Sequence, residues 1–157
     1  MAQAALATES VADSETEIEI RRTFQAPRDI VYAAWSDPRQ LVQWWGPEGM
    51  TVPTCDWQAV EGQRWRTCMQ APDGQQYCVG GDFREVTPPE RLVFTWTWES
   101  ESEGATAGLE TLVSVEFSEQ GEATEVCLRH LQLRDRETCE GHLKGWTSSF
   151  GCLARLV

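Results

Sequence analysis

Alternation of apolar and polar residues dominates residues 17–133 and predicts a sheet of antiparallel strands. Ile18 and Ile20 alternate with charged residues, the period of a half-buried strand, and Ala26-Pro27 ends that segment. The same period returns after residue 50, with turn signals such as Pro72-Asp73-Gly74 between the apolar runs. It predicts further strands over residues 51–59, 64–71, 76–86, 91–99, 111–118 and 124–133.

Three segments have the period of a helix instead. Residues 28–36 place apolar side chains on one side, and a second helix is expected to run from Pro38 to about Trp45. Asp37 can cap the free amide hydrogens of that second helix, and proline fits its first position. Apolar residues at spacings of three and four then predict a long helix over about 136–157, with the stripe Leu143, Trp146, Phe150, Leu153 and Val157.

The order of these elements is strand, two short helices, a run of strands and one long helix. Runs of this kind favour an α+β architecture with the helices on one face of an antiparallel sheet. Residues 1–16 are small, polar or acidic, so we expect a disordered N-terminal tail followed by one domain over residues 17–157. We interpret Gly80-Gly81, inside a predicted strand, as a bulge that bends the sheet.

Composition restricts the partners. The chain has 157 residues and a formal net charge of −12, which argues against nucleic acid and against anionic membrane surfaces. No segment has the roughly 20 apolar residues that cross a bilayer. Six cysteines are spread without a Cys-x-x-Cys pair, and residues 1–16 lack the features of a secretory signal. We therefore expect reduced thiols, a cytoplasmic location and neither metal nor cofactor.

Tryptophan, with eight residues in the chain, supplies most of the candidates for function. Indole rings are large and rigid, and many of them do not easily pack together without leaving a void, so we expect them to enclose a cavity. A filled core is the alternative. The predicted ligand-binding residues are Trp35, Trp45, Met50, Trp57, Trp65, Met69, Trp96, Trp98, His130, Trp146 and Phe150.

Several short motifs occur in the order seen in one family. They are Ala26-Pro27, Trp35-Ser-Asp-Pro38, Trp44-Trp45-Gly46-Pro47, Gly62-Gln-Arg-Trp65-Arg66, Pro72-Asp73-Gly74, Gly81-Asp-Phe83 through Arg91-Leu92, Thr124-Glu-Val126-Cys-Leu128-Arg-His130 and Gly145-Trp146. The chain thereby resembles the activator of heat-shock protein 90 ATPase homologue family, within the START-like or SRPBCC superfamily. The resemblance covers about residues 17–157.

The resemblance implies a helix-grip fold, in which a bent antiparallel sheet wraps the C-terminal helix and two short helices close one end. It also implies an apolar ligand cavity between helix and sheet, in a family whose members are seldom enzymes. One departure is that the chain stops at Val157, whereas homologues often run slightly further. A shorter helix end would leave the mouth of the cavity more open.

His130 is the one weak candidate for catalysis. It follows Thr124, Val126 and Leu128 at a period of two, so it points to the same side as those residues. A histidine in a cavity can act as a general base, but a hydrogen-bonded core histidine is the alternative. His142 lies one turn before Trp146 and is a conceivable partner for it.

Three functions follow from these observations. The first is non-enzymatic binding of a small hydrophobic ligand, aromatic or lipid-like, by a monomer or homodimer. The second is a co-chaperone-like domain that contacts a chaperone or another protein through its acidic exterior. The third is an enzyme of the cyclase or aromatase type that uses His130.

Overall fold

The computed structural model describes residues 9–13, 15–100 and 107–157 of the 157-residue chain. The elements are β1 (Glu9–Asp13), β2 (Ile18–Phe24), α1 (Arg28–Ser36), α2 (Pro38–Leu41), β3 (Thr51–Asp56), β4 (Arg64–Gln70), β5 (Gln76–Thr87), β6 (Arg91–Trp98), β7 (Thr111–Gln120), β8 (Ala123–Leu131) and α3 (Arg136–Leu156). The strands form one eight-stranded sheet in the order β1-β2-β8-β7-β6-β5-β4-β3. All neighbouring strands are antiparallel.

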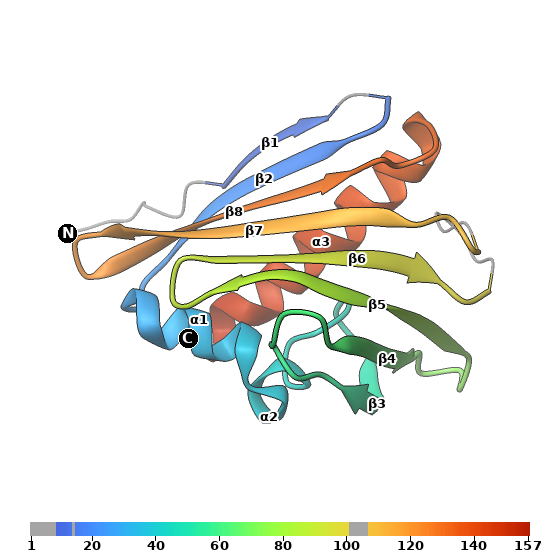
Figure 1. Ribbon diagram of the computed structural model, residues 1–157, viewed down its shortest axis with the longest axis horizontal. Helices are drawn as coiled ribbons and strands as arrows, with labels where there is room; N and C mark the ends of the chain where they lie inside the picture. Colours follow the sequence, from blue (N-terminus) through green and yellow to red (C-terminus); the bar gives the residue numbers. More distant parts are fainter. Residues whose placement is uncertain (1–8, 14, 101–106) are drawn as a thin grey trace.

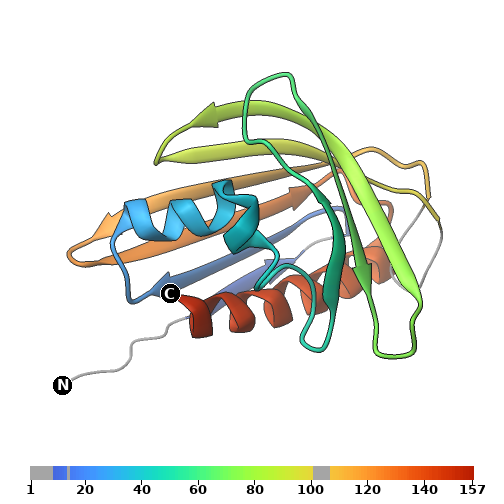
Figure 2. The same cartoon turned by 90° about the horizontal axis from the view of Figure 1, so that it is seen from below.

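The sheet curves around α3, as Figures 1 and 2 show. The helix lies along the concave face, and α1 and α2 lie at the end of the sheet where α3 terminates (Figure 2). The α+β helix-grip architecture expected from the sequence is confirmed. In the part of the chain that the structure describes, no helix is long and apolar enough to cross a membrane.

The N-terminal segment corrects one expectation. Residues 9–13 form strand β1, which pairs with β2 from Glu9↔Arg22 to Asp13↔Ile18, whereas the sequence predicted a disordered tail over residues 1–16. An edge strand is held by main-chain hydrogen bonds, so it needs little of the apolar pattern by which buried strands are recognised. Residues 1–8 and 14 of the predicted tail lie outside the described residues.

The short helices begin as expected, but the second ends early. The Asp37 carboxylate accepts a hydrogen bond from the Arg39 amide, and α2 ends at Leu41 rather than near Trp45. The amides of Trp44 and Trp45 still donate to the Leu41 carbonyl, so the chain continues in a turn up to Gly46. Gly46 has φ +93°, which a residue with a side chain rarely adopts.

The bend of the sheet is produced differently from the prediction. The register of β5 against β6 shifts between Phe83 and Glu85, so the bulge does not lie at Gly80-Gly81. A Cβ atom on Gly81 would lie 2.1 Å from the Thr95 carbonyl oxygen. Glycine is therefore needed at this position because two backbones approach closely.

The expectation of reduced thiols is wrong for one pair. Cys68 on β4 and Cys78 on β5 face each other across the hairpin and form a disulfide, with Cα atoms 4.1 Å apart. The Pro72-Asp73-Gly74 turn sets this register, because Gln70 pairs with Gln76 and the cysteines follow two residues further on. The disulfide does not include Cys55, Cys127, Cys139 or Cys152. The thiols therefore no longer support a cytoplasmic location.

Candidate functional site

Much of the core beneath the sheet is a cluster of indole rings, most of whose N–H groups anchor the ring to an acceptor, whereas the buried N–H groups of Trp35 and Trp96 make no hydrogen bond within the described chain. Trp57 Nε1 donates to the Trp35 carbonyl at 2.7 Å, which ties the segment after β3 to the end of α1. Trp45 Nε1 donates to the Thr67 hydroxyl at 3.0 Å, and Trp65 Nε1 donates to the Thr95 carbonyl at 3.1 Å. Because buried N–H donors are costly to leave unpaired, these bonds fix the direction of each ring.

A cavity of about 490 Å³ opens between this cluster, strands β4–β6 and helix α3. It is partly open to solvent, and its volume lies in the range of small-molecule sites. Rings and thioethers come from the sheet and from the loop after α2, while α3 contributes small or polar residues and the indole of Trp146. The lining residues are Trp45, Gly46, Pro47, Met50, Met69, Tyr77, Trp96, Trp98, Gly141, His142, Lys144, Gly145, Trp146, Ser148 and Ser149.

Space for the cavity exists on the helix side because small residues lie on one face of α3. Gly141, Gly145 and Ser148 follow each other at spacings of four and three and therefore lie on the same side of α3. A Cβ on Gly145 would meet nothing closer than Pro47 Cγ at 4.0 Å. Opposite the helix, Gly46 is in close contact with Met69, since a Cβ there would lie 2.8 Å from the Met69 Sδ atom. Small residues on the helix thus face bulky ones on the sheet.

His130 on β8 lies behind the cavity wall in a closed hydrogen-bond chain. Trp146 Nε1 donates to His130 Nδ1 at 3.1 Å, and since an indole only donates, that nitrogen carries the lone pair. The ring proton is therefore on Nε2, which donates to the Thr111 hydroxyl at 2.7 Å. The Thr111 hydroxyl in turn donates a hydrogen bond to the Trp96 carbonyl oxygen at 2.8 Å. Neither nitrogen of His130 is available to a ligand.

His142 on α3 is held in the same way. Its Nδ1 donates to the Thr138 carbonyl at 2.8 Å, because a carbonyl oxygen only accepts. Its Nε2 then accepts from Trp98 Nε1 at 3.0 Å. The two imidazole rings lie 4.8 Å apart between centroids. Each histidine therefore needs its neutral form to receive the indole N–H of a tryptophan that lines the cavity.

Burial lowers the pKa of both histidines. The pKa of His130 lies well below the usual 6.5 because the ring is desolvated and His142 is close. Desolvation also lowers the pKa of His142, against a smaller opposing effect of the Thr138 carbonyl. Both rings are therefore neutral at pH 7, and the lone pairs through which they would act as bases are taken by tryptophan. Nowhere among residues 9–13, 15–100 and 107–157 do three metal-ligating side chains gather.

We expect stability to fall as the pH drops below 6.5. Both histidines have a lower pKa in the folded state than in the unfolded chain, so the unfolded chain binds more protons in this range. Their contribution is full above 6.5, and each loses up to about 1.4 kcal/mol per pH unit until its folded-state pKa is reached. Urea denaturation between about pH 5 and pH 7.5 measures the slope, above the range where carboxylates of ordinary pKa titrate.

His142→Gln is the matched variant, because glutamine keeps a side-chain acceptor and does not titrate. It should remove about half of the slope. A free energy of unfolding that stays constant between pH 5 and pH 7 in the wild type would contradict the neutral assignment of the two rings.

The structure brings together six of the eleven predicted site residues. Trp45, Met50, Met69, Trp96, Trp98 and Trp146 line the cavity. The other five do not: Trp35, Trp57, Trp65, His130 and Phe150 are at most 1% exposed and belong to the interior behind it. Indole N–H bonds to main-chain carbonyls hold Trp57 and Trp65 there, while the edge of Phe150 packs on Phe24 at 5.7 Å.

Sequence reasoning missed most of the helix side of the cavity. Five residues that line the cavity were not among the predicted site residues: Tyr77 from β5, and His142, Lys144, Ser148 and Ser149 from α3. A signal existed in the small residues of the long helix, because Gly141, Gly145 and Ser148 recur on one face. The apolar stripe of α3 identifies only the side of the helix that packs on the sheet.

A second, more polar hollow of about 340 Å³ lies beside the first. The two share Trp45, Gly46, Pro47 and Met50, and the second is completed by Glu48, Arg155 and neighbours at the end of α3. Arg155 and Glu48 are 3.4 Å apart and form an exposed ion pair. The hollow therefore has its charged groups already paired.

Comparison with known proteins agrees with this geometry. The chain shares 33% identity with the AHSA1 protein of Silicibacter pomeroyi, whose crystal structure superposes with a TM-score of 0.79 over 88% of this chain and 95% of that one. A protein of Chromobacterium violaceum has 25% identity and a TM-score of 0.79, over 90% and 96% of the two chains. No curated protein matches. The family model of the Activator of Hsp90 ATPase homolog 1-like proteins matches residues 25–157. The chain belongs to this family.

Proposed function

We propose that this protein binds a small apolar ligand, aromatic in at least one part, in the cavity between β4–β6 and α3, and that it does so without catalysing a reaction. The observation that carries the proposal is the wall itself. Three indole rings, two thioethers and a phenol from the sheet and the loop after α2 face, across about 490 Å³, the glycines and serines of α3 together with the indole of Trp146. Flat rings present π faces on which an aromatic ligand stacks.

Burial of apolar surface supplies a large part of the free energy of binding. A ligand the size of naphthalene that loses about 200 Å² of apolar surface gains on the order of 5 kcal/mol at 25 cal/mol per Å². Part of this gain is offset by lost translational and rotational freedom, so burial alone gives a dissociation constant in the millimolar range, and stacking on the indole rings strengthens it. The fixed orientation of the rings, with the indoles of Trp45, Trp98 and Trp146 each donating a hydrogen bond, keeps the cavity preformed.

Titration with naphthalene-type ligands tests the proposal. Trp45, Trp96, Trp98 and Trp146 line the cavity, so an occupant in contact with them should change the tryptophan emission of the protein in a saturable way. Native mass spectrometry of the protein as purified from cells should in addition reveal a co-purifying small molecule. An emission spectrum unchanged across a panel of aromatic, lipid and polyketide-like compounds would contradict the proposal.

The cyclase alternative loses its base in this geometry. Both nitrogens of His130 are hydrogen-bonded, and the ring does not line the cavity. A general base needs a lone pair that reaches the substrate directly or through one water. The wall residues therefore support binding better than they support proton transfer.

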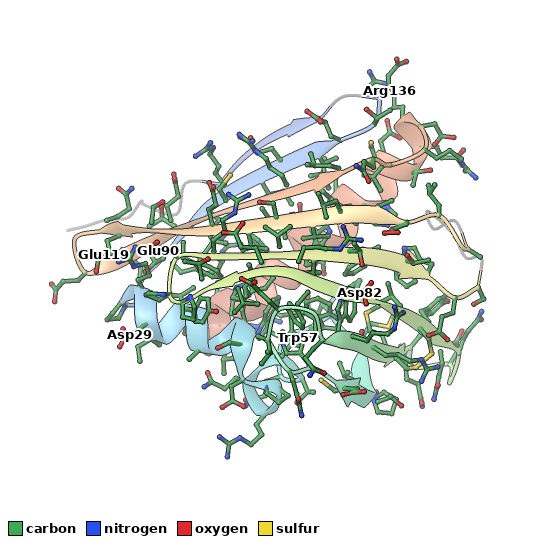
Figure 3. All side chains as sticks on the ribbon, viewed as in Figure 1. Asp29, Trp57, Asp82, Glu90, Glu119 and Arg136 are labelled. Carbon is green, nitrogen blue, oxygen red and sulfur yellow. A yellow bond between two sulfur atoms is a disulfide. The ribbon has the colours of Figure 1, made fainter. Side chains whose placement is uncertain are left out.

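Contact with a partner protein is the second candidate, and it is the activity after which the family is named. The exterior favours it, because the net charge is −12 and the exposed carboxylates of Asp29, Glu90 and Glu119 gather at the end of the molecule where α1 begins (Figure 3). We infer a partner with a basic surface, met by a monomer or homodimer. A pull-down with Hsp90 at low and high salt separates this candidate from ligand binding, since an electrostatic contact weakens with salt.

A further inference from the structure

Among the described residues, the lining of the cavity carries a single formal charge, and it is positive. The chain has 25 acidic residues, yet none of the described residues that line the cavity is acidic. The pKa of His142 is lowered, so this lining residue is neutral at pH 7. The charge that remains belongs to Lys144, the one lysine in the sequence.

Lys144 has no carboxylate partner among the residues that the structure describes. At least ten of the twelve arginines do lie within 4.0 Å of a carboxylate among the residues that the structure describes. Glu140 lies four residues earlier on α3, the spacing at which a glutamate usually pairs with a lysine, but no salt bridge joins the two. In so acidic a protein, Lys144 is thus a cation left without a counter-charge beside the cavity.

A second donor lies one turn along the helix. Ser148 also lines the cavity, and its Oγ accepts the Glu48 amide at 2.9 Å. The hydroxyl hydrogen of Ser148 makes no bond within the described chain, so it is free to donate. Lys144 and Ser148 are four residues apart and therefore lie on one helix face, where an ammonium and a hydroxyl can both donate to one carboxylate.

We propose that the ligand is an aromatic monocarboxylate, with its ring against the tryptophans and its carboxylate at Lys144 and Ser148. The inference rests on the proposed binding function and narrows its ligand class. The walls provide for the apolar ring, and the exposed position of Lys144 lets the charged group keep part of its hydration. An ion pair at such a site contributes up to about 1 kcal/mol, which is roughly fivefold in affinity.

Calorimetric titration with 2-naphthoate, 2-naphthamide and 2-naphthylmethylammonium tests this ligand class, because the three share a ring system and differ in charge. The wild type should bind 2-naphthoate about fivefold more tightly than 2-naphthamide and bind the ammonium compound most weakly. Rising salt should weaken binding of 2-naphthoate and leave that of 2-naphthamide unchanged. Lys144→Met should remove the preference without changing the affinity for 2-naphthamide, and Lys144→Arg should keep it.

Arg136→Met is the matched control. Arg136 is an exposed cation at the start of the same helix and is not among the residues that line the cavity. Figure 3 shows it at the N-terminal end of α3. Removing it changes the net charge equally and should leave the preference intact. Equal binding of 2-naphthoate and 2-naphthamide by the wild type, or a preference that survives in Lys144→Met, overturns the inference while binding itself stands. Failure of all three compounds to bind overturns the proposed function as well.

Discussion

Gly145→Leu is expected to abolish binding of an aromatic ligand while leaving the protein folded. Gly145 lines the cavity from the middle of α3, and a Cβ there makes only an ordinary contact, with Pro47 Cγ at 4.0 Å. The leucine side chain would then extend into space that the ligand needs. Replacing a helical glycine also gains about 1 kcal/mol in helix propensity, so we expect no loss of stability.

Gly151→Leu provides the matched control for this variant. Gly151 lies on the same helix, does not line the cavity, and has no atom within 4 Å of an added Cβ. It gains the same helix propensity without filling the site. Titration with 2-naphthoate or 2-naphthamide should show more than a tenfold loss of affinity for Gly145→Leu, which is more than about 1.4 kcal/mol. Gly151→Leu should show no change. Retained binding in Gly145→Leu would place the ligand elsewhere.

The fold was predictable because its elements bury one face each. The period of two in β7, where Val113, Val115 and Phe117 are buried, and the period of three to four in α3 both state which side meets the core. Capping of α2 by Asp37 was also predictable from the sequence. Strand β1 was not, since an edge strand is selected by the free backbone of β2 rather than by its own apolar pattern.

The cavity was predictable only in part, because sequence parity gives the face of a strand and not the depth of a side chain. Trp65 and Met69 have the same parity on β4, and both are buried. Met69 lines the cavity, whereas Trp65 is drawn into the core by its bond to the Thr95 carbonyl. A void is a property of the whole packing arrangement, so no single residue pattern reports it.

The chemistry of the site depended on contacts between distant residues. The sequence predicted that His130 points inward, but it holds no sign that the Trp146 indole donates a hydrogen bond to His130 Nδ1. Nothing in the charge or the periodicity of the sequence marked Lys144 as a site residue. Its role follows from two structural facts together: it lines the cavity, and it has no carboxylate partner among the described residues. The Cys68–Cys78 disulfide was within reach, since the predicted hairpin turn already placed the two cysteines opposite each other.

Trp57→Ala is expected to cost about 3–5 kcal/mol of folding free energy, the usual loss when a fully buried aromatic residue is truncated. Trp57 is 1% exposed, and its ring lies 5.0–5.4 Å from the rings of Phe83, Trp45, Trp65 and Phe94. The variant also leaves the Trp35 carbonyl without its indole donor. Urea denaturation followed by far-UV circular dichroism measures the loss.

Trp98→Ala separates the core of the indole cluster from the wall of the cavity. Trp98 lines the cavity, is only half-buried, and bonds to His142 rather than to the main chain. Its removal should cost roughly 1–2 kcal/mol, since little apolar surface is lost from the interior. It should nevertheless weaken binding of 2-naphthamide, because Trp98 lines the cavity whereas Trp57 does not. Equal losses of stability in the two variants would mean that the wall and the core form one packed unit, and the division between filled interior and open cavity would then be wrong.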